Sequence, residues 1–409
     1  MLKRLFPKVH ARYAASANGA LLADFAAGLV SAGYARHAAH GHVRRLKQAL
    51  EWMSSAPFAP DAGISAVFVS QAFASLQAQT RFQGTQRAFE RFLAARGQLL
   101  KEPDPSRFAP LLDRYRAHLL EVRGLVVSTA DQHIATIKRF LAQALSADAP
   151  LQDLSALAVE QFVTAEGRRM KRQSLQHVVA RLRAFLRFCF ERDAVPERLD
   201  VIDAPRVYRG ELPPRALAWS LVQRLLRSVD RSSRLGWRDY AILHLMAHYG
   251  LRPSEIVTLT LGSIDWQAKT LRVKQCKTRS DLILPLAGQT MRMLRRYLYR
   301  GRPGGTRPEL FLRGRTPAGP LTHYAIGDLY QKRARESGLS LQGTSSYCLR
   351  HSFAMRLLDR RVGVKVIGDL LGHRTLESTC VYLRLQTRTL REVALPLPTP
   401  VAGIVEGAA

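Results

Sequence analysis

The chain has 409 residues, and 62 Lys and Arg residues against 32 Asp and Glu residues give it a formal net charge of +30 and a pI near 11.0. Such a charge favours a polyanionic partner, of which nucleic acid is the obvious candidate. No apolar run is long enough to span a membrane, and the four cysteines show neither CxxC spacing nor metal-ligand clustering, so we expect a reduced, cytoplasmic protein with no membrane partner.

The N-terminal half contains an internal repeat. Residues 21–52 resemble residues 111–143, and His42 aligns with His133 at an offset of 91. Similar pieces follow both copies, RAFERFL at 87–93 and RAFLRFCF at 183–190. Apolar residues at helical spacing, separated by short polar turns, predict that each copy is a small helical bundle.

Proline-containing polar segments divide the chain at residues 101–105 and 203–214. They predict four parts: an extra N-terminal helical domain, a second helical domain, a C-terminal domain and a tail, at 1–100, 108–203, 213–395 and 396–409. Basic residues gather at the start of the helix predicted within 167–192, and we expect this helix to meet DNA. The extra domain either binds a second DNA site or contacts another protomer.

The C-terminal half begins with two helices that meet at a turn. Residues 239–249 form a mostly apolar stretch that predicts a buried helix, and Gly250 is placed to end it. Arg252 and Pro253 then open the next helix, because proline favours an early helical position. Arg252 is therefore expected at a helix N-terminus, where anions are favoured.

A hairpin and two further helices follow. Residues 271–274 and 282–285 flank a polar stretch as the strands of a β-hairpin would, which places Lys277 at the tip. A helix begins near Tyr347 and carries Arg350, and another helix ends at the glycine before His373. Tyr382 follows nine residues later.

Five of these side chains fit a phosphodiester-cutting site that needs no metal or cofactor: Arg252, Lys277, Arg350, His373 and Tyr382. An arginine stays protonated, and its planar fork matches two phosphate oxygens at once. A tyrosine hydroxyl can attack phosphorus and leave a covalent phosphotyrosine. A lysine can protonate the departing sugar oxygen as a general acid.

The same segments, in the same order, resemble the tyrosine recombinases of the phage-integrase and Xer type over residues 108–395. HYGLRPSEIVTL at 248–259 resembles the first arginine box of this family, and QCKTRSDLILPL at 275–286 resembles its lysine hairpin. LRHSFA at 349–354, LLGH at 370–373 and Tyr382 resemble the second arginine box, the His/Trp position and the nucleophile. Each piece is weak by itself, but five in the right order are specific.

The resemblance implies roles for single residues. Arg252 and Arg350 would clamp the scissile phosphate, Lys277 would protonate the 5′ leaving oxygen, His373 would hydrogen-bond the phosphate or the nucleophile, and Tyr382 would attack. Glu255 matches an accessory acid that orients Arg252.

The resemblance also implies a fold and partners. The fold would be mainly α with a small β-sheet: helical, SAM-like DNA-binding domains and a mixed α/β catalytic domain. The partners would be double-stranded DNA and three further protomers in a homotetramer, with or without sister recombinases, at the nucleoid. No small-molecule substrate is implied.

One position departs from the family pattern. The second arginine box usually reads His-x-x-Arg, and here Tyr347 stands in the place of that histidine. Tyrosine is a poor base at neutral pH, although it can donate a hydrogen bond to phosphate. We do not expect His351 to take over the role of the missing base, because one residue past Arg350 on a helix points about 100° away. We expect it to pack beside the box instead. Cleavage is therefore expected to be slower than is usual for the family, and Tyr347→His should accelerate it.

These observations predict a site-specific DNA recombinase or integrase that serves a mobile element or resolves chromosomes or plasmids. One alternative is a relative of the type IB topoisomerases, which shares the chemistry without strand exchange. The other is a catalytically weak partner that binds DNA beside an active sister recombinase. The helical domain beside the catalytic domain and the Xer-like boxes favour recombination. Tyr347 is the feature that leaves the weakly catalytic, DNA-binding partner as an alternative.

Overall fold

A computed structural model describes residues 1–53, 63–74, 80–100, 107–146, 148–206, 215–275, 280–316 and 319–385. Lys277, the tail at 396–409 and the linker at 101–105 lie outside these residues. The chain divides into two compact units, with residues 1–10, 23–41 and 212–409 in one and residues 11–22 and 42–211 in the other.

Within residues 1–100, the described segments form helices and one short pair of parallel strands. The helices are α1 (Leu2–Leu5), α2 (His10–Ala14), α3 (Gly19–Ser31), α4 (Arg36–Met53), α5 (Ala66–Ala74) and α6 (Thr80–Ala95). The strands are β1 (Ile64–Ser65) and β2 (Leu99–Leu100). Helices α3 to α6 cover the first copy of the sequence repeat.

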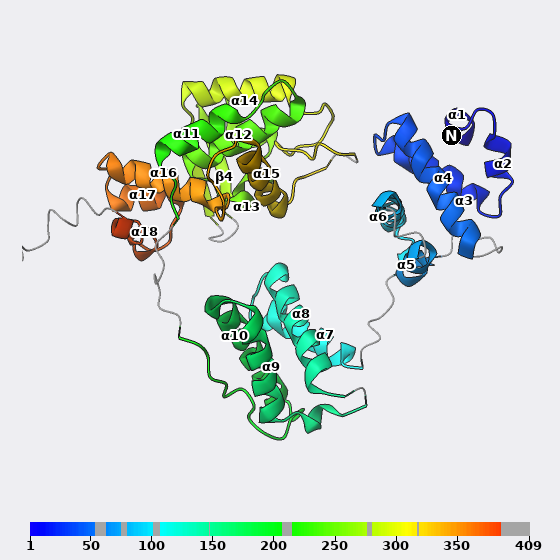
Figure 1. The fold of residues 1–409 in the computed structure, drawn as a ribbon, viewed down its shortest axis with the longest axis horizontal. Coiled ribbons are helices and arrows are strands. Elements are labelled where there is room, and N and C mark those ends of the chain that lie inside the picture. Colours follow the sequence, from blue (N-terminus) through cyan, green and yellow to red (C-terminus); the bar gives the residue numbers. More distant parts are fainter. Residues whose placement is uncertain are drawn as a thin grey trace, which may run out of the picture. The chain divides into compact units, whose positions relative to one another are not determined.

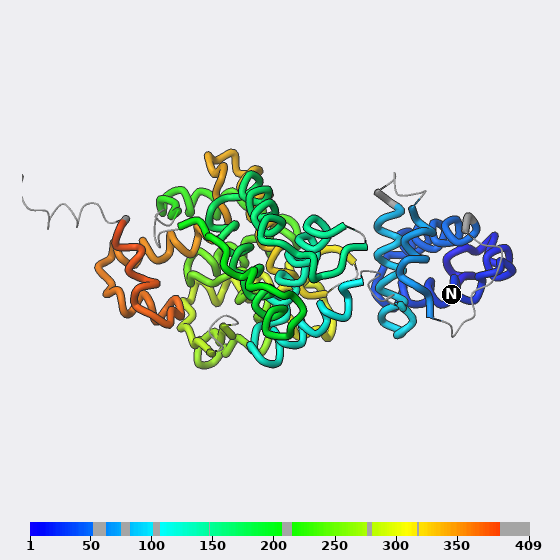
Figure 2. Tube along the Cα trace, turned by 90° about the horizontal axis from the view of Figure 1, so that it is seen from below, coloured from blue at the N-terminus to red at the C-terminus, as the bar shows by residue number. Residues whose placement is uncertain are grey.

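The second copy also consists of four helices, which lie side by side (Figure 1). They are α7 (Ala109–Ala117), which continues into a wider turn at His118–Val122, α8 (Val127–Ala144), α9 (Ala156–Arg169) and α10 (Arg172–Phe190). Figure 2 follows the chain through them from cyan to green. Their shared core contains fully buried aromatic rings, among which Phe140 and Phe162 meet edge to face at 5.3 Å. Such pairs add to the free energy gained by burying apolar area.

Both copies contain a hydrogen bond between an arginine and a threonine, but the two residue types occupy exchanged positions. Arg45 on α4 aligns with Thr136 on α8, and the RAF motifs align Thr85 on α6 with Arg181 on α10. In the first copy Arg45 Nε donates to Thr85 Oγ1 at 2.7 Å. In the second copy Arg181 Nη1 donates to Thr136 Oγ1 at 3.1 Å. An Arg–Thr bond therefore joins the second and fourth helices of each copy, with the two residues exchanged.

The aligned histidines of the copies share an environment as well. His42 Nδ1 lies 2.9 Å from the hydroxyl of Thr85, and His133 Nδ1 lies 3.0 Å from the hydroxyl of Tyr115. Burial and, next, a nearby arginine lower the pKa of each imidazole to about 4; the arginine is Arg45 for His42 and Arg181 for His133. Both histidines are therefore neutral at pH 7.

The described residues between 215 and 385 contain a three-stranded antiparallel sheet and the remaining α-helices. The strands are β3 (Ile264–Asp265), β4 (Thr270–Gln275) and β5 (Ser280–Pro285), in the order β3-β4-β5 with Leu271 opposite Leu284. The helices are α11 (Trp219–Ser228), α12 (Arg234–Tyr249), α13 (Pro253–Thr258), α14 (Gly288–Arg300), α15 (His323–Glu336), α16 (Tyr347–Asp359), α17 (Val364–Leu371) and α18 (Glu377–Cys380). The predicted fold class, mainly α with a small sheet, is confirmed.

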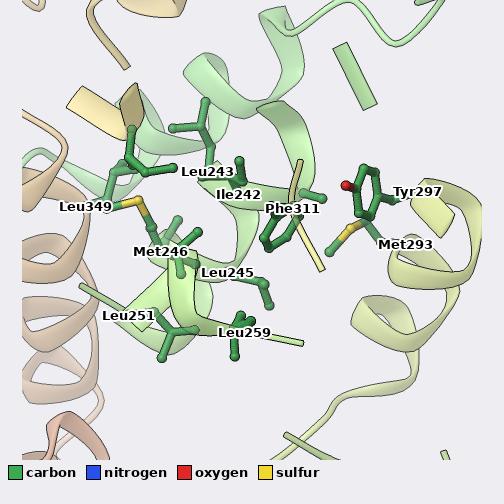
Figure 3. Packing of buried hydrophobic residues seen from close by; sticks show 14 of the residues in the cluster. Ile242, Leu243, Leu245, Met246, Leu251, Leu259, Met293, Tyr297, Phe311 and Leu349 are labelled. Atoms are coloured by element: carbon green, nitrogen blue, oxygen red, sulfur yellow. The ribbon is translucent and has the colours of Figure 1, made fainter. Parts of the chain in front are cut away.

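Helix α12 forms the centre of the hydrophobic core of residues 215–385. Its Ile242, Leu243, Leu245 and Met246 are fully buried, and Figure 3 shows them among side chains from other elements, including Leu349 and Phe311. A helix that is buried on all sides has a mostly apolar sequence, as residues 239–249 do. No helix in the described part of the chain is long and apolar enough to cross a membrane.

Two glycines end the helices that border the site. Gly250 caps α12 at φ 65°, and Gly372 caps α17 at φ 62°, in the left-handed region that side chains disfavour. A Cβ at Gly250 would lie 2.7 Å from the side chains of Phe353 and Leu371. Only glycine therefore lets α12, α16 and α17 approach one another this closely.

Candidate active site

Arg252 and Glu255 form a local unit at the start of α13. Arg252 is the N-cap residue, and Glu255 stands in the first turn. Glu255 Oε2 accepts the backbone N–H of Arg252 at 2.8 Å, and Oε1 accepts Arg252 Nη1 at 2.6 Å. The Glu255 side chain is 2% exposed and that of Arg252 is 15% exposed. The acid thus fixes both the backbone and the guanidinium of Arg252, as expected for an orienting residue.

Arg350 on α16 is held by the ends of two other helices. Its Nη1 donates to the carbonyl of Gly250 and its Nη2 to the carbonyl of Leu371, both at 2.6 Å. Both carbonyls lie at helix C-termini, where the helix dipole favours a cation. Glu255 Oε2 lies 3.9 Å from Nη1. Burial, and next Arg252, lowers the pKa of Arg350 to about 10, so the guanidinium stays charged at neutral pH.

His373 connects Arg350 to α18. Its Nε2 lies 3.1 Å from Arg350 Nη2, and its Nδ1 lies 2.8 Å from Thr379 Oγ1. Because arginine can only donate, Nε2 accepts and the proton of a neutral imidazole sits on Nδ1. The contact of His373 with phosphate or nucleophile, which the sequence suggested, stays a prediction.

Tyr382 lies two residues after the end of α18, near the arginines of its own chain. Its ring is 2% exposed and packs in a small cluster with Ala354, Leu358, Ile367 and Leu371. Its hydroxyl lies 3.0 Å from His351 Nδ1. Burial raises the pKa of the phenol, whereas Arg350 and Arg252 lower it. The phenol is therefore close enough to both guanidiniums for their charge to lower its pKa.

His351 packs beside the second arginine box, but the argument that its direction takes it away from the nucleophile is wrong, because its ring contacts the Tyr382 hydroxyl. Arg350 points from α16 toward the ends of α12 and α17, while His351 points toward the segment after α18. The site contacts more than one face of α16, so a side chain that is rotated by about 100° from Arg350 can still lie in the site. No signal in the sequence indicates the path by which the chain after α18 returns to this helix.

Tyr347 and Lys277 are the remaining predicted residues. Tyr347 is the first residue of α16 and is 48% exposed, and its charge interaction with Arg350 places it near the site. Lys277 lies outside the described residues, two positions beyond the end of β4. The last residue of β4, Gln275, packs against Gly372, next to His373 in the chain. The root of the hairpin thus borders the site.

Comparison with known proteins identifies the family. Residues 216–388 match the sequence profile of the Phage integrase family. A putative integrase/recombinase of Sinorhizobium fredii is 31% identical over 299 residues, which cover 72% of each chain. The tyrosine recombinase XerD of Mycobacterium leprae is 34% identical over 218 residues, 49% of this chain and 68% of that one. The chain therefore belongs to the phage integrase family of tyrosine recombinases.

Solved structures share the fold. A lambda integrase dimer bound to a COC′ core site matches with a TM-score of 0.54 and 20% identity, over 67% of this chain and 76% of that one. The Tn1549 transposon integrase in complex with circular intermediate DNA matches with a TM-score of 0.54 and 16% identity, over 69% of this chain and 98% of that one.

Proposed function

We propose that the protein is a site-specific recombinase or integrase that cuts and rejoins double-stranded DNA through a covalent link between Tyr382 and a 3′ phosphate. One observation carries the proposal. The Tyr382 hydroxyl lies beside His351 and within the electrostatic influence of Arg350 and Arg252, all in one chain. A nucleophile and two fixed cations are the parts that phosphoryl transfer without a metal requires.

Each site residue has a role in one step of cleavage. Arg252 and Arg350 hold the non-bridging oxygens and stabilise the charge that develops there. The Tyr382 oxygen bonds to phosphorus as the bond from phosphorus to the 5′ oxygen breaks, and the general acid, which we assign to Lys277, protonates that oxygen. Rejoining runs in reverse, with a 5′-hydroxyl from another strand attacking the phosphotyrosine.

The partners follow from charge and strand count. The net charge of +30 favours a DNA duplex, and the Tn1549 integrase resemblance supports a mobile element as the context. Exchange between two duplexes cuts four strands. Because each protomer contributes one Tyr382, a complete exchange requires four protomers, either four copies of this chain or copies together with a sister recombinase.

The test uses the full-length protein and a duplex selected by its binding from a randomised pool. A nick placed beside the scissile phosphate lets the short cut strand diffuse away, so the covalent intermediate accumulates. We expect a denaturation-resistant protein–DNA adduct with the wild type and none with Tyr382→Phe.

Two results would contradict the proposal. Tight DNA binding without any adduct would identify a binding-only partner of another recombinase. An adduct accompanied by relaxation of supercoiled plasmid, but never by recombinant products on plasmids that carry two sites, would identify a topoisomerase-like enzyme.

A further inference from the structure

We infer that His351 positions Tyr382 and accepts the phenolic proton as the tyrosine attacks phosphorus, an assignment that rests on the proposed recombinase function. The site lacks the usual histidine at position 347, and yet the nucleophile has an imidazole partner at 3.0 Å. His351 is the residue directly after Arg350.

The geometry fits both tasks. A phenol is a stronger hydrogen-bond donor than an imidazole N–H, and an imidazole nitrogen is a stronger base than a phenol oxygen, so Tyr382 donates and His351 Nδ1 accepts. The donated proton fixes the direction of the hydroxyl, and the oxygen lone pairs stay available for phosphorus. Arg350 holds α16 against two other helices, so the backbone of its neighbour His351 is fixed too.

Electrostatics keep both partners in the required protonation states. Burial lowers the pKa of His351 and Arg350 lowers it further, so the imidazole is neutral at pH 7. The phenol keeps its proton, because burial raises the pKa of Tyr382. Among the described residues, the groups that act on His351 are Arg350 on its own helix and Tyr382 from the segment after α18. A DNA phosphate bound at Arg350 offsets that positive charge and makes His351 more basic.

The other candidates for this role fit less well. Tyr347 is 48% exposed, and a phenol is a poor proton acceptor at neutral pH. His373 already uses Nε2 toward Arg350 and Nδ1 toward Thr379. His351 therefore supplies the base that Tyr347 cannot, and the reason for expecting slow cleavage no longer holds. Tyr347→His should change the cleavage rate by less than about threefold.

The protons balance in both directions. As the bond from the Tyr382 oxygen to phosphorus forms, the phenolic proton moves to His351 Nδ1 and leaves an imidazolium. The 5′ oxygen departs with a proton from the general acid assigned to Lys277. In rejoining, the imidazolium returns its proton to the tyrosine oxygen, and the incoming 5′-hydroxyl gives its proton to the lysine.

The test compares His351→Asn with the wild type in single-turnover adduct formation. Asparagine can place its Oδ1 near the position of Nδ1, so it keeps a hydrogen-bond acceptor but cannot take up a proton. Two nicked duplexes are used, one with the normal 5′ oxygen and one with sulfur in its place. Sulfur departs without protonation, so it rescues the loss of a general acid and not the loss of a proton acceptor. We expect His351→Asn to be about 10²-fold slower on both duplexes, with unchanged DNA affinity.

A pH profile of the wild type needs no substitution. Because the pKa of His351 in the folded, DNA-free protein lies below the ordinary 6.5, the imidazole loses its acceptor only as the pH falls below that value. The second-order rate of adduct formation should therefore fall in this acidic range, and His351→Asn should lack this part of the profile.

The outcomes separate the two claims. A wild type that forms no adduct at Tyr382 contradicts the recombinase function itself. A wild type that forms it, together with a His351→Asn rate within about threefold of normal or restored by the sulfur duplex, overturns the role of His351 alone. If His351→Asn fails to fold, a wild-type rate that does not fall in the acidic range also overturns it.

Discussion

The arginine half and the nucleophile half of the site differ in how they are held. Arg252 and Glu255 belong to α13, which packs into the large core of the catalytic unit, and Arg350 bonds to carbonyls at two helix ends. Tyr382 follows the four-residue helix α18 and packs in a small cluster of buried side chains. The first half is part of the large core, whereas a smaller apolar cluster holds the second half.

This difference shows which part of the chemistry is prepared before DNA arrives. Electrostatic stabilisation works best with donors that need no reorganisation, and the guanidiniums meet that condition. A nucleophile must move toward phosphorus and back, and a segment held by a small cluster should open locally at a lower cost in free energy than the large core. Substitutions in the two halves should therefore affect stability and cleavage in different proportions.

The largest effect is expected from Arg350→Gln. It removes a cation from the phosphate site and leaves at least one of the carbonyls of Gly250 and Leu371 buried without a donor. We expect adduct formation to slow by about 10³-fold and the free energy of unfolding to fall by about 3 kcal/mol. Chemical denaturation and the nicked-duplex assay measure both. Tyr382→Phe is the matched variant: it should abolish the adduct but change stability by about 1 kcal/mol, and equal stability losses would contradict the comparison.

Glu255→Gln should have the next largest effect. The shape is kept, but the buried negative charge beside Arg252 and Arg350 is lost, which leaves two guanidiniums uncompensated. We expect a loss of about 2 kcal/mol in the free energy of unfolding and about 10-fold to 10²-fold slower cleavage.

A phosphate should partly replace the missing charge of Glu255, so cognate DNA should stabilise Glu255→Gln more than it stabilises the wild type in a thermal-unfolding assay. Glu336→Gln, at a carboxylate that is 48% exposed in its ion pair with Arg333, is the control and should change stability by less than about 1 kcal/mol. If Glu255→Gln and Glu336→Gln lost similar amounts of unfolding free energy, the buried carboxylate would contribute no more to stability than an exposed one.

The smallest effect is expected from Thr379→Val. It removes the hydroxyl that receives the Nδ1 proton of His373 without changing the volume much. We expect about fivefold slower cleavage and a stability loss near 1 kcal/mol, because one hydrogen bond is lost in the weakly held half. Thr379→Ser, which keeps the hydroxyl, should restore most of the rate. A stability loss as large as that of Arg350→Gln would mean that this half is as firmly built as the other.

Much of the site could be predicted because its chain reversals depend on particular residue types. Gly250 and Gly372 adopt positive φ, and Pro253 favours an early helical position, so the ends and beginnings of these helices are visible in the sequence. The partners of Arg350 could not be predicted, because backbone carbonyls leave no trace in residue type. His351 was missed because helical periodicity gives directions around one helix and not the path of the chain that returns to it.

The Arg–Thr hydrogen bond occurs in both helical copies with its two residues exchanged, and this exchange disfavours mispairing of helices between the copies during folding. If α10 took the place of α6 beside α4, Arg181 would face Arg45, and in the reverse swap Thr85 would face Thr136. The first mismatch brings like charges together, and the second leaves two hydroxyls where a guanidinium had bridged the helices. Two bundles of related sequence on one polypeptide, and on neighbouring copies of it, thereby discriminate against each other's fourth helix.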